Sequence, residues 1–344
     1  MVAMSGGVDS SVAALLAMRM GYECTGVTMK LFGNDGGDAA RVAASLGIPH
    51  ETIDLKDEFL ESVIEPFVSA YEAGETPNPC VECNIRLKFG LLFDRARALD
   101  FDKLVTGHYA RVVQAPEGIS GGRGGWRLER AADAAKDQSY FLYGIAPEKL
   151  EHIIFPLGGL TKKETRALAA EAGFKSASAK ESQDICFIGD GGRAGYAGFI
   201  ESFRGEPSKP GNFVDTSGRI IGRHGGVIRY TIGQRKGLGV AVGRPVYVKD
   251  IRPETGEVVL ADEKELFVSR IEITGLNWQS GEGPRYTRAE IMIRYGGRPA
   301  WAAISALPDG NLLAEFDEPV RAPAKGQSAV LYDGDLVLGG GRIG

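Results

Sequence analysis

Two of the four cysteines, Cys80 and Cys83, lie three positions apart in the segment TPNPCVECN, residues 76–84. Such a pair can supply half of a zinc site, a redox pair, or a nucleophile with a neighbouring thiol. A closed zinc site needs four ligands, and the sequence has no second C-x-x-C and no H-x-x-x-H. The prolines argue against a helix interior, so we expect Cys83 to precede a helix that begins at Ile85 and whose dipole lowers the pKa of the thiol. This pattern favours a nucleophile.

The other two cysteines, Cys24 and Cys186, lie far from that segment. Four scattered cysteines do not form the framework of a secreted disulfide-rich domain, so structural, metal-binding or catalytic roles in a reducing compartment are expected. Cys186 stands between apolar neighbours in ESQDICFIGD, residues 181–190. By itself it is typical of a buried structural cysteine.

A glycine turn, SGGVDSS (residues 5–11), lies between an apolar run at residues 1–4 and a helical pattern that ends at Gly21. Such a turn presents backbone N–H groups and the positive end of the helix dipole to an anion. The spacing fits neither G-x-x-x-x-G-K-[ST] nor G-x-G-x-x-G, and no lysine follows to reach a γ-phosphate. We interpret the turn as a pyrophosphate site; the alternative is a turn that serves packing alone.

The same turn resembles the PP-loop of ATP pyrophosphatases, which cleave ATP between the α- and β-phosphates. The resemblance implies that the loop residues, Ser11 included, bind pyrophosphate, that Asp9 orients the loop or Mg²⁺, that Met29 stacks on adenine, and that Gly107 in TGHY approaches the nucleotide closely. The expected ATP-binding residues are Ala3, Met4, Ser5, Gly6, Gly7, Val8, Asp9, Ser10, Met29 and Gly107.

Strands and helices alternate in the N-terminal half, which predicts a parallel sheet with helices on its faces, of the Rossmann-like type. Glycines 121, 122, 124 and 125 are interpreted as a hairpin tip, and TKKE (161–164) as a capping box that opens a helix. The strands are expected at residues 1–4, 25–32, 50–55 and 102–113, and the helices at 12–21, 38–47, 58–73, 85–99 and 161–173.

The pattern changes after Phe203, where short apolar runs broken by glycine and proline replace the helical periodicity. We expect two small β domains there, the last a β-barrel, with a break near residues 262–267. The predicted organisation is an α/β catalytic domain at 1–202, a β-rich tRNA-binding domain at 203–263 and a barrel domain at 264–344.

The composition of the 344 residues, 43% hydrophobic and 25% charged, is that of a soluble globular protein. No apolar run of about 18 residues and no signal peptide are apparent, so we expect a cytoplasmic protein without a membrane partner. The formal net charge of -5 argues against indiscriminate nucleic-acid binding. Residues 203–246 nevertheless carry eight basic side chains against two acidic ones, which favours a local RNA-binding face around GQRKGLG.

Seven motifs occur in the order seen in the tRNA-specific 2-thiouridylases, the MnmA/TrmU family, and the chain resembles that family over essentially its whole length. They are SGGVDSS, TPNPCVECN, TGHYAR, KDQSYFLY, ICFIGD, YTIGQRKGLG and GQSAVLY. The resemblance implies that ATP adenylates the 2-carbonyl of the wobble uridine in tRNA, that sulfur then replaces the activated oxygen, and that 2-thiouridine, AMP and pyrophosphate result.

For the cysteines, the resemblance implies that Cys186 carries sulfur as a persulfide, received from a sulfur donor protein, and that Cys83 is a nucleophile. The persulfide attacks the base, or Cys83 attacks the persulfide to release sulfide; both routes can leave a Cys83–Cys186 disulfide. Cys80 replaces an aspartate found in some relatives. As an alternative, Cys80, Cys83 and Cys186 together hold a four-iron, four-sulfur cluster.

The wobble base must leave the stack of the anticodon loop to reach such a pocket. By resemblance, residues from several motifs contact the base or the rest of the tRNA. They are Asn78, Pro79, Cys80, His108, Lys136, Asp137, Gln138, Arg235, Lys236, Arg294, Tyr295 and Gln327.

Two rival functions fit parts of the pattern. Another adenylating PP-loop enzyme, such as an amidotransferase-type synthetase or a lysidine-forming ligase, would not need Cys186. A tRNA-binding protein without catalysis would need neither Asp9 nor Cys83.

Overall fold

The computed structural model describes residues 1–31, 37–114, 125–178, 185–188, 192–280 and 286–344. The predicted glycine tip at 121–124 and most of the ESQDICFIGD motif lie outside these residues, whereas Cys186 lies within them. None of the described helices is long and apolar enough to cross a bilayer.

The N-terminal half is built on a parallel sheet in the order β3-β2-β1-β4-β7, which confirms the α/β prediction. The chain runs outward from β1 to β3 and then returns to place β4 on the other side of β1. This reversal creates a topological switch point between β1 and β4, the place where parallel sheets of this kind bind ligands. The strands are β1 (Val2–Ala3), β2 (Gly26–Lys30), β3 (His50–Asp54), β4 (Leu104–Val105) and β7 (Ile153–Ile154).

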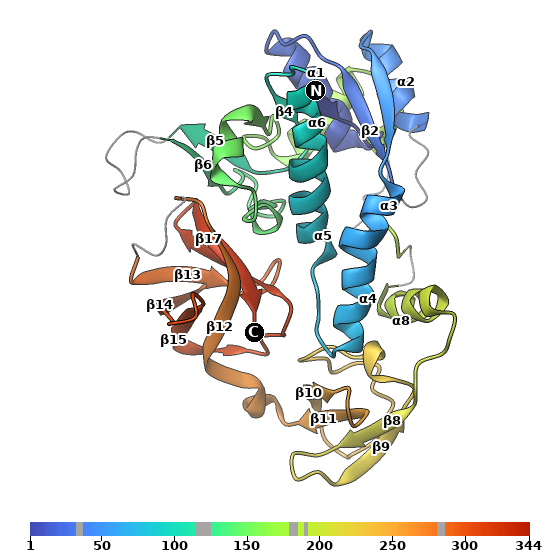
Figure 1. Cartoon of the computed structure of the whole chain (residues 1–344), viewed down its shortest axis with the longest axis vertical. Coiled ribbons are helices and arrows are strands. Elements are labelled where there is room, and N and C mark those ends of the chain that lie inside the picture. The colour runs from blue at the N-terminus through green and yellow to red at the C-terminus, as the bar shows by residue number, and fades with distance from the viewer. Residues whose placement is uncertain (32–36, 115–124, 179–184, 189–191, 281–285) are drawn as a thin grey trace.

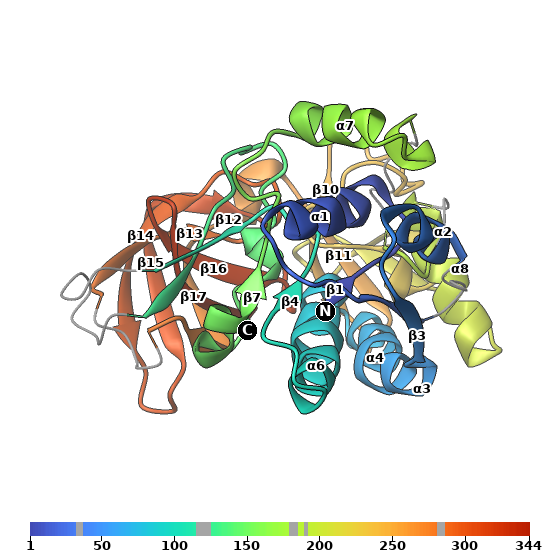
Figure 2. The same ribbon diagram turned by 90° about the horizontal axis from the view of Figure 1, so that it is seen from above.

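Helices cover both faces of this sheet (Figure 2). On one face α1 (Val8–Arg19) and α2 (Gly37–Leu46) bury small side chains such as Ala13 and Ala43 against Val2. Small residues on both sides let the helices approach the strands closely, and α7 (Lys162–Glu171) packs on α1.

The other face carries two long helical segments. The first comprises α3 (Lys56–Phe59), η1 (Leu60–Ile64) and α4 (Glu65–Glu72), and the second comprises α5 (Pro79–Glu82), η2 (Cys83–Leu92) and α6 (Phe93–Ala98). Residues 83–92 are wound as a π-helix, and Gly90 fits this winding because a Cβ there would lie 2.8 Å from the Ile85 carbonyl oxygen. The second helix thus begins at Pro79, earlier than predicted, because proline is well tolerated in the first turn, where its missing N–H has no partner in any case.

The C-terminal part contains two β units (Figure 1). The first follows α8 (Gly192–Arg204), which crosses the boundary predicted at residue 202, and is a four-stranded sheet in the order β10-β11-β8-β9. The second is a barrel of six strands, closed by pairing of β12 with β17, as predicted. The strands are β8 (Gly211–Val214), β9 (Ile220–His224), β10 (Tyr247–Arg252), β11 (Glu257–Ala261), β12 (Phe267–Trp278), β13 (Arg288–Met292), β14 (Ala300–Ala306), β15 (Leu312–Arg321), β16 (Ser328–Asp333) and β17 (Leu336–Ile343).

The single strand predicted at residues 102–113 is wrong. It is divided into β4, in the parallel sheet, and β5 (Arg111–Gln114), which forms a hairpin with β6 (Trp126–Glu129). This hairpin extends the barrel sheet, because Glu129 pairs with Leu336 of β17. Residues 106–110 turn the chain away from the parallel sheet, and this turn brings functional residues to the end of β4.

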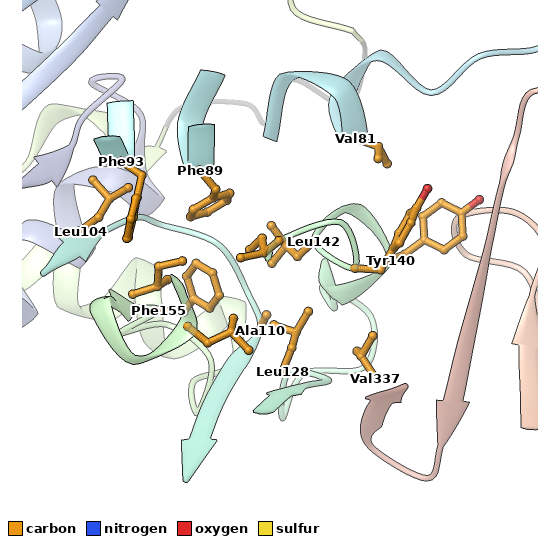
Figure 3. Close-up of a cluster of buried hydrophobic side chains, with 14 of the residues drawn as sticks. Val81, Phe89, Phe93, Leu104, Ala110, Leu128, Tyr140, Leu142, Phe155 and Val337 are labelled. Atoms are coloured by element: carbon orange, nitrogen blue, oxygen red, sulfur yellow. The ribbon is translucent and has the colours of Figure 1, made fainter. Parts of the chain in front are cut away.

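A shared hydrophobic core joins the N-terminal half to the barrel (Figure 3). It extends from Phe89 and Phe93 on the second helical segment through Tyr140 and Leu142 to Val337 of β17. The Tyr140 hydroxyl donates a hydrogen bond to the Ser328 carbonyl oxygen at 2.8 Å. The two parts therefore pack as one unit around the candidate active site.

The remaining short helices are η3 (Ser139–Phe141), η4 (Pro147–His152), η5 (Lys175–Ser178), η6 (Val227–Arg229) and η7 (Glu263–Leu266).

Candidate active site

The phosphate loop lies at the switch point, at the end of β1. Gly6 has φ +80°, and a Cβ there would lie 2.5 Å from the Cβ of Asp38, so both the conformation and the space require glycine. Helix α1 begins at Val8 with Gly7 as its N-cap and no side chain capping it, so its first backbone N–H groups remain available to an anion.

The serines hold this loop in shape. The Ser10 hydroxyl donates to the Gly7 carbonyl oxygen and accepts from the backbone N–H of Ser5, both at 3.1 Å. The Ser11 hydroxyl also donates to Gly7, at 2.8 Å, and the side chain is fully buried. Ser11 therefore braces the loop from behind, and the prediction that it binds pyrophosphate is wrong in this geometry.

Gly107, at the end of β4, lies directly against the loop. A Cβ at this position would lie 2.8 Å from the carbonyl carbon of Asp9 and 2.8 Å from the backbone nitrogen of Ser10. Only glycine lets the chain after β4 come this close to the first turn of α1. The next residue, His108, is held by a hydrogen bond between its Nδ1 and the Thr106 hydroxyl at 2.7 Å.

Asp9 is held from a distant part of the chain. Lys162 Nζ lies 2.7 Å and 2.8 Å from its two carboxylate oxygens, and the Tyr109 hydroxyl donates to Oδ1 at 3.0 Å. Lys162 is the first residue of α7 and lies between Thr161 and Glu164, whose predicted capping box the structure confirms. A lysine from a distant helix thus neutralises the carboxylate of the phosphate loop.

A cavity of about 440 Å³ extends from the phosphate loop to the cysteines. Ala3, Met4 and Met29 line its nucleotide end, together with Ser5 and Asp9. Met4 is nearly fully buried and Met29 is half-buried, so Met29 presents the larger apolar surface to a base.

The three cysteines of interest line the other end of this cavity. Cys80 and Cys83 come from the first turns of the second helical segment, and Cys186 comes from the described segment 185–188. Cys83 is buried, whereas Cys80 and Cys186 are exposed to the open cavity. Thiols from residues more than a hundred positions apart thus line the same cavity.

The environment raises the pKa of all three thiols. The surrounding protein removes water from around the thiols, and this desolvation raises the pKa of Cys80 to about 11 although its side chain is open to the cavity. Desolvation also raises the pKa of Cys83 and that of Cys186. The Lys88 ammonium opposes these shifts at each thiol. The prediction of a lowered Cys83 pKa is therefore wrong: Cys83 lies inside the helical segment, and loss of hydration raises the pKa of its thiol.

The predicted base-contacting residues surround this cavity to different degrees. Pro79, His108 and Gln138 line it directly. Asn78 precedes Pro79 but lines a separate cavity of about 50 Å³. The loop that contains it is joined to the barrel by a hydrogen bond from Gln327 Nε2 to the Thr76 carbonyl oxygen at 2.9 Å. Gln327 therefore positions the segment that leads into Cys80.

Tyr295 brings the barrel to the edge of the cavity. Its ring lies 4.4 Å, between centroids, from that of Phe141, which lines the cavity, and its side chain remains 48% exposed. An exposed ring at such a rim is suited to stacking on an unpaired base. The neighbouring Arg294 donates to the Arg321 carbonyl oxygen.

Asp137 does not face a ligand. Its carboxylate is buried and accepts hydrogen bonds from the backbone N–H groups of Ala131 and Ser139 and from the Ser139 hydroxyl. It thus orders the turn that presents Lys136 and Gln138, and a direct contact of Asp137 with tRNA does not fit this structure.

Arg235 and Lys236 lie away from the thiols, around a separate cavity of about 720 Å³ that is also lined by Arg229 and Tyr230. The surface around them carries less unpaired positive charge than its composition suggests, because four of the eight basic residues at 203–246 form ion pairs. These four are Arg204, Arg219, Arg229 and Arg244.

Comparison with known proteins covers nearly the whole chain. Residues 1–190 match the family model described as tRNA methyl transferase HUP domain, residues 198–262 the tRNA methyl transferase PRC-barrel domain, and residues 268–343 the aminomethyltransferase beta-barrel domain. The protein named tRNA-specific 2-thiouridylase MnmA of Lachnoclostridium phytofermentans is 44% identical, with 99% of this chain and 98% of the relative aligned. Proteins of the same name from Moorella thermoacetica (44%; 100% and 98%) and Carboxydothermus hydrogenoformans (42%; 100% and 96%) are similar to it over the same extent.

The chain belongs to the MnmA family of tRNA-specific 2-thiouridylases. This confirms the family inferred from the order of the sequence motifs. Within the MnmA fold, two lysines that the motifs did not single out lie at the centre of the site: Lys162 and Lys88. No sequence motif around either lysine indicates a role in the site, because each acts on residues that are close to it only in the folded protein.

The Lys162 interaction leads to a testable prediction. Lys162→Met leaves Asp9 partly buried without its counter-charge, so we expect AMP formation to fall roughly tenfold through a distorted phosphate loop. Pyrophosphate release from ATP in the presence of unmodified tRNA measures the effect. The adjacent exposed Lys163→Met is the matched control and should leave the rate unchanged; equal rates for both variants would contradict the role of Lys162.

Proposed function

We propose that this protein is an ATP-dependent tRNA-uridine 2-sulfurtransferase that makes 2-thiouridine at the wobble position. One observation carries the proposal: the phosphate loop, Gly107 and three thiols line a single cavity. ATP binds at the end of the parallel sheet with its adenine near Met29. The target base enters from the side of His108, Gln138 and Tyr295.

In the first step O2 of the uracil forms a bond to the α-phosphorus while the bond from that phosphorus to the bridging oxygen breaks. Pyrophosphate leaves with the electron pair, and the N3 proton of the base passes to solvent. Backbone N–H groups at the start of α1 stabilise the departing charge. The 2-oxygen is now part of a good leaving group.

In the second step the terminal sulfur of a Cys186 persulfide forms a bond to C2, and the C2–O2 bond breaks to release AMP. Cys83 then attacks the Cys186 sulfur, which forms a Cys83–Cys186 disulfide and leaves the other sulfur on the base as the thiocarbonyl. Alternatively Cys83 first releases sulfide, which attacks C2. A thiol reductant reopens the disulfide, and a persulfide-carrying donor protein reloads Cys186.

The Mg²⁺ that accompanies ATP is assigned to the phosphates. Asp9 is the only carboxylate among the described residues that line the cavity, and Lys162 already contacts both its oxygens. Asp9 is therefore better suited to orienting the loop than to binding the ion.

An iron–sulfur cluster fits the described site poorly. Three thiols share the cavity, but the described residues contain no group of three side chains arranged to hold a metal ion. We therefore develop the persulfide route, in which Cys80 remains a protonated thiol beside the base because its pKa is about 11.

Cys80→Ala tests this choice. We expect the variant to keep most of its thiolation activity, because Cys80 forms no bond in either persulfide step. Thiolation and visible absorbance of anaerobically purified protein are measured together. Loss of both would contradict the persulfide route and favour a cluster, because removal of one of three thiolate ligands destroys such a site.

The tRNA backbone is expected to follow the basic cavity around Arg235 and Lys236, while Tyr295 and Lys136 contact the anticodon loop. In this arrangement the domain at 1–202 performs the chemistry, the domain at 203–263 binds the tRNA, and the barrel at 264–344 completes the pocket. A protein with this substrate belongs in the cytoplasm.

The deciding experiment incubates the protein with ATP, Mg²⁺, a persulfide donor and unmodified tRNA and measures 2-thiouridine by mass spectrometry. The proposal expects 2-thiouridine together with stoichiometric AMP. AMP without 2-thiouridine would favour another adenylating enzyme, and binding of tRNA without AMP would favour a protein that has no catalytic activity.

A further inference from the structure

Lys88 places in the active-site cavity a positive charge that no described carboxylate pairs with. Among the described residues lining the cavity, the carboxylate or ammonium side chains are those of Asp9 and Lys88. Asp9 is neutralised by Lys162, whereas Lys88 forms no ion pair within the described part of the chain. The remaining basic side chain, His108, is neutral at physiological pH, because burial and the nearby Lys88 ammonium hold its pKa well below the usual value.

The position of Lys88 follows from the unusual helix winding. Lys88 comes five residues after Cys83 within the π-helical segment, and five residues is the hydrogen-bond spacing of a π-helix, so both side chains lie on the face that lines the cavity. Lys88 lines the same cavity as Cys80, Cys83 and Cys186, and its charge lowers the pKa of all three thiols against the effect of desolvation.

Lys88 also reaches toward the phosphate loop. Its Nζ lies 3.4 Å from Nε2 of His108, and His108 adjoins Gly107, which packs on the backbone of Asp9 and Ser10. The ammonium therefore lies between the nucleotide end and the thiol end of the cavity.

The proposed reaction places the anionic α-phosphoryl group at that junction. When the base is adenylated, the α-phosphorus is one oxygen atom away from the carbon that sulfur attacks. A cation near the thiols is therefore also within reach of the α-phosphoryl group. A partly buried ammonium without a counter-ion is costly, and an anionic ligand offsets that cost.

We propose that Lys88 binds the α-phosphoryl group, stabilising it while AMP is transferred to the uracil oxygen and again while AMP departs as sulfur attacks C2. This inference rests on the proposed function for its chemistry, since both steps are those described above. It assigns Lys88 as a catalytic residue in addition to the cysteines.

The test compares ligands that differ only in this group. Binding of AMP and of adenosine is measured by calorimetry for wild type, Lys88→Met and Lys88→Arg. We expect Lys88→Met to weaken AMP binding about tenfold, the loss of one charge-assisted contact, while adenosine binding is unchanged. Lys88→Arg should restore part of the preference for AMP.

Kinetics supply a second readout. With saturating ATP, the kcat for AMP formation should fall roughly thirtyfold in Lys88→Met, less than the hundredfold typical of a donor in a closed site, because this cavity is open to water. Arg86→Met removes an exposed charge two residues away on the same helix and should change neither kcat nor AMP binding.

The outcomes separate the two proposals. If wild type makes no 2-thiouridine, the proposed function fails, whereas the comparison of AMP with adenosine still tests Lys88. If Lys88→Met binds AMP as wild type does, or loses AMP and adenosine binding equally, the role of Lys88 is overturned. If Cys186 is alkylated more slowly in Lys88→Met than in wild type while AMP binding is unchanged, the role of Lys88 is likewise overturned, since Lys88 would then serve the thiols alone.

Thermal unfolding of each variant identifies a folding defect. If Lys88→Met has such a defect, Lys88→Gln replaces it in both measurements.

Discussion

Cys186→Ser is expected to reduce 2-thiouridine formation by at least about a thousandfold while pyrophosphate release continues. The hydroxyl of serine cannot carry a persulfide, so no sulfur reaches the activated base, yet the phosphate loop and Gly107 are untouched. The assay supplies sulfur from a protein-bound persulfide and measures both products in the same reaction.

Cys24→Ser is the matched control for that experiment. Cys24 is a half-buried thiol that does not line the cavity; it packs against the core beneath α1 and α2, and its sulfur donates a hydrogen bond to the Tyr22 carbonyl oxygen. We expect this variant to thiolate tRNA at the wild-type rate. Thiolation by Cys186→Ser at that same rate would contradict the assigned chemistry.

Gly107→Ala is expected to lower AMP formation about a hundredfold. The added Cβ would lie 2.8 Å from backbone atoms of Asp9 and Ser10, and backbone cannot move aside as a flexible side chain can. The phosphate loop must shift, and a misplacement of about 1 Å costs a reaction of this kind roughly a hundredfold. Single-turnover release of pyrophosphate measures the loss.

The control for this substitution is Gly159→Ala, because a Cβ at that glycine would meet no atom within 4 Å. It adds the same methyl group nearby in the same domain and should leave the rate unchanged. An active Gly107→Ala would show that the end of β4 does not approach the nucleotide.

The phosphate site could be predicted from the sequence because its determinants are local. A strand, a glycine turn and a helix follow one another within twenty residues, and the structure retains that order. The sequence predicts too late a start for the helix that carries Cys83, because proline disfavours a helix interior, whereas Pro79 occupies the first turn.

Other features depend on tertiary contacts and have no local pattern. The raised pKa of Cys83 reflects burial by distant segments, and the pairing of Lys162 with Asp9 spans 153 positions. The convergence of Cys186 on Cys83 followed from family resemblance, since its own surroundings in the sequence indicate only a buried cysteine. Local sequence patterns therefore predict the phosphate loop and the C-x-x-C segment, but not the lysines, Lys162 and Lys88, whose charges act on them.

The attachment of the β5–β6 hairpin to the barrel affects how the protein is made. Glu129 pairs with Leu336, and an ion pair joins Arg111 to Asp335 across 224 positions of the chain. The ribosome must therefore translate that whole interval before the hairpin finds its neighbour, and such long-range pairing is slow to form. During translation the β5–β6 hairpin, which lies next to the active site, therefore remains without its partner strand β17. We expect the protein to acquire activity only after the downstream strands have been synthesised.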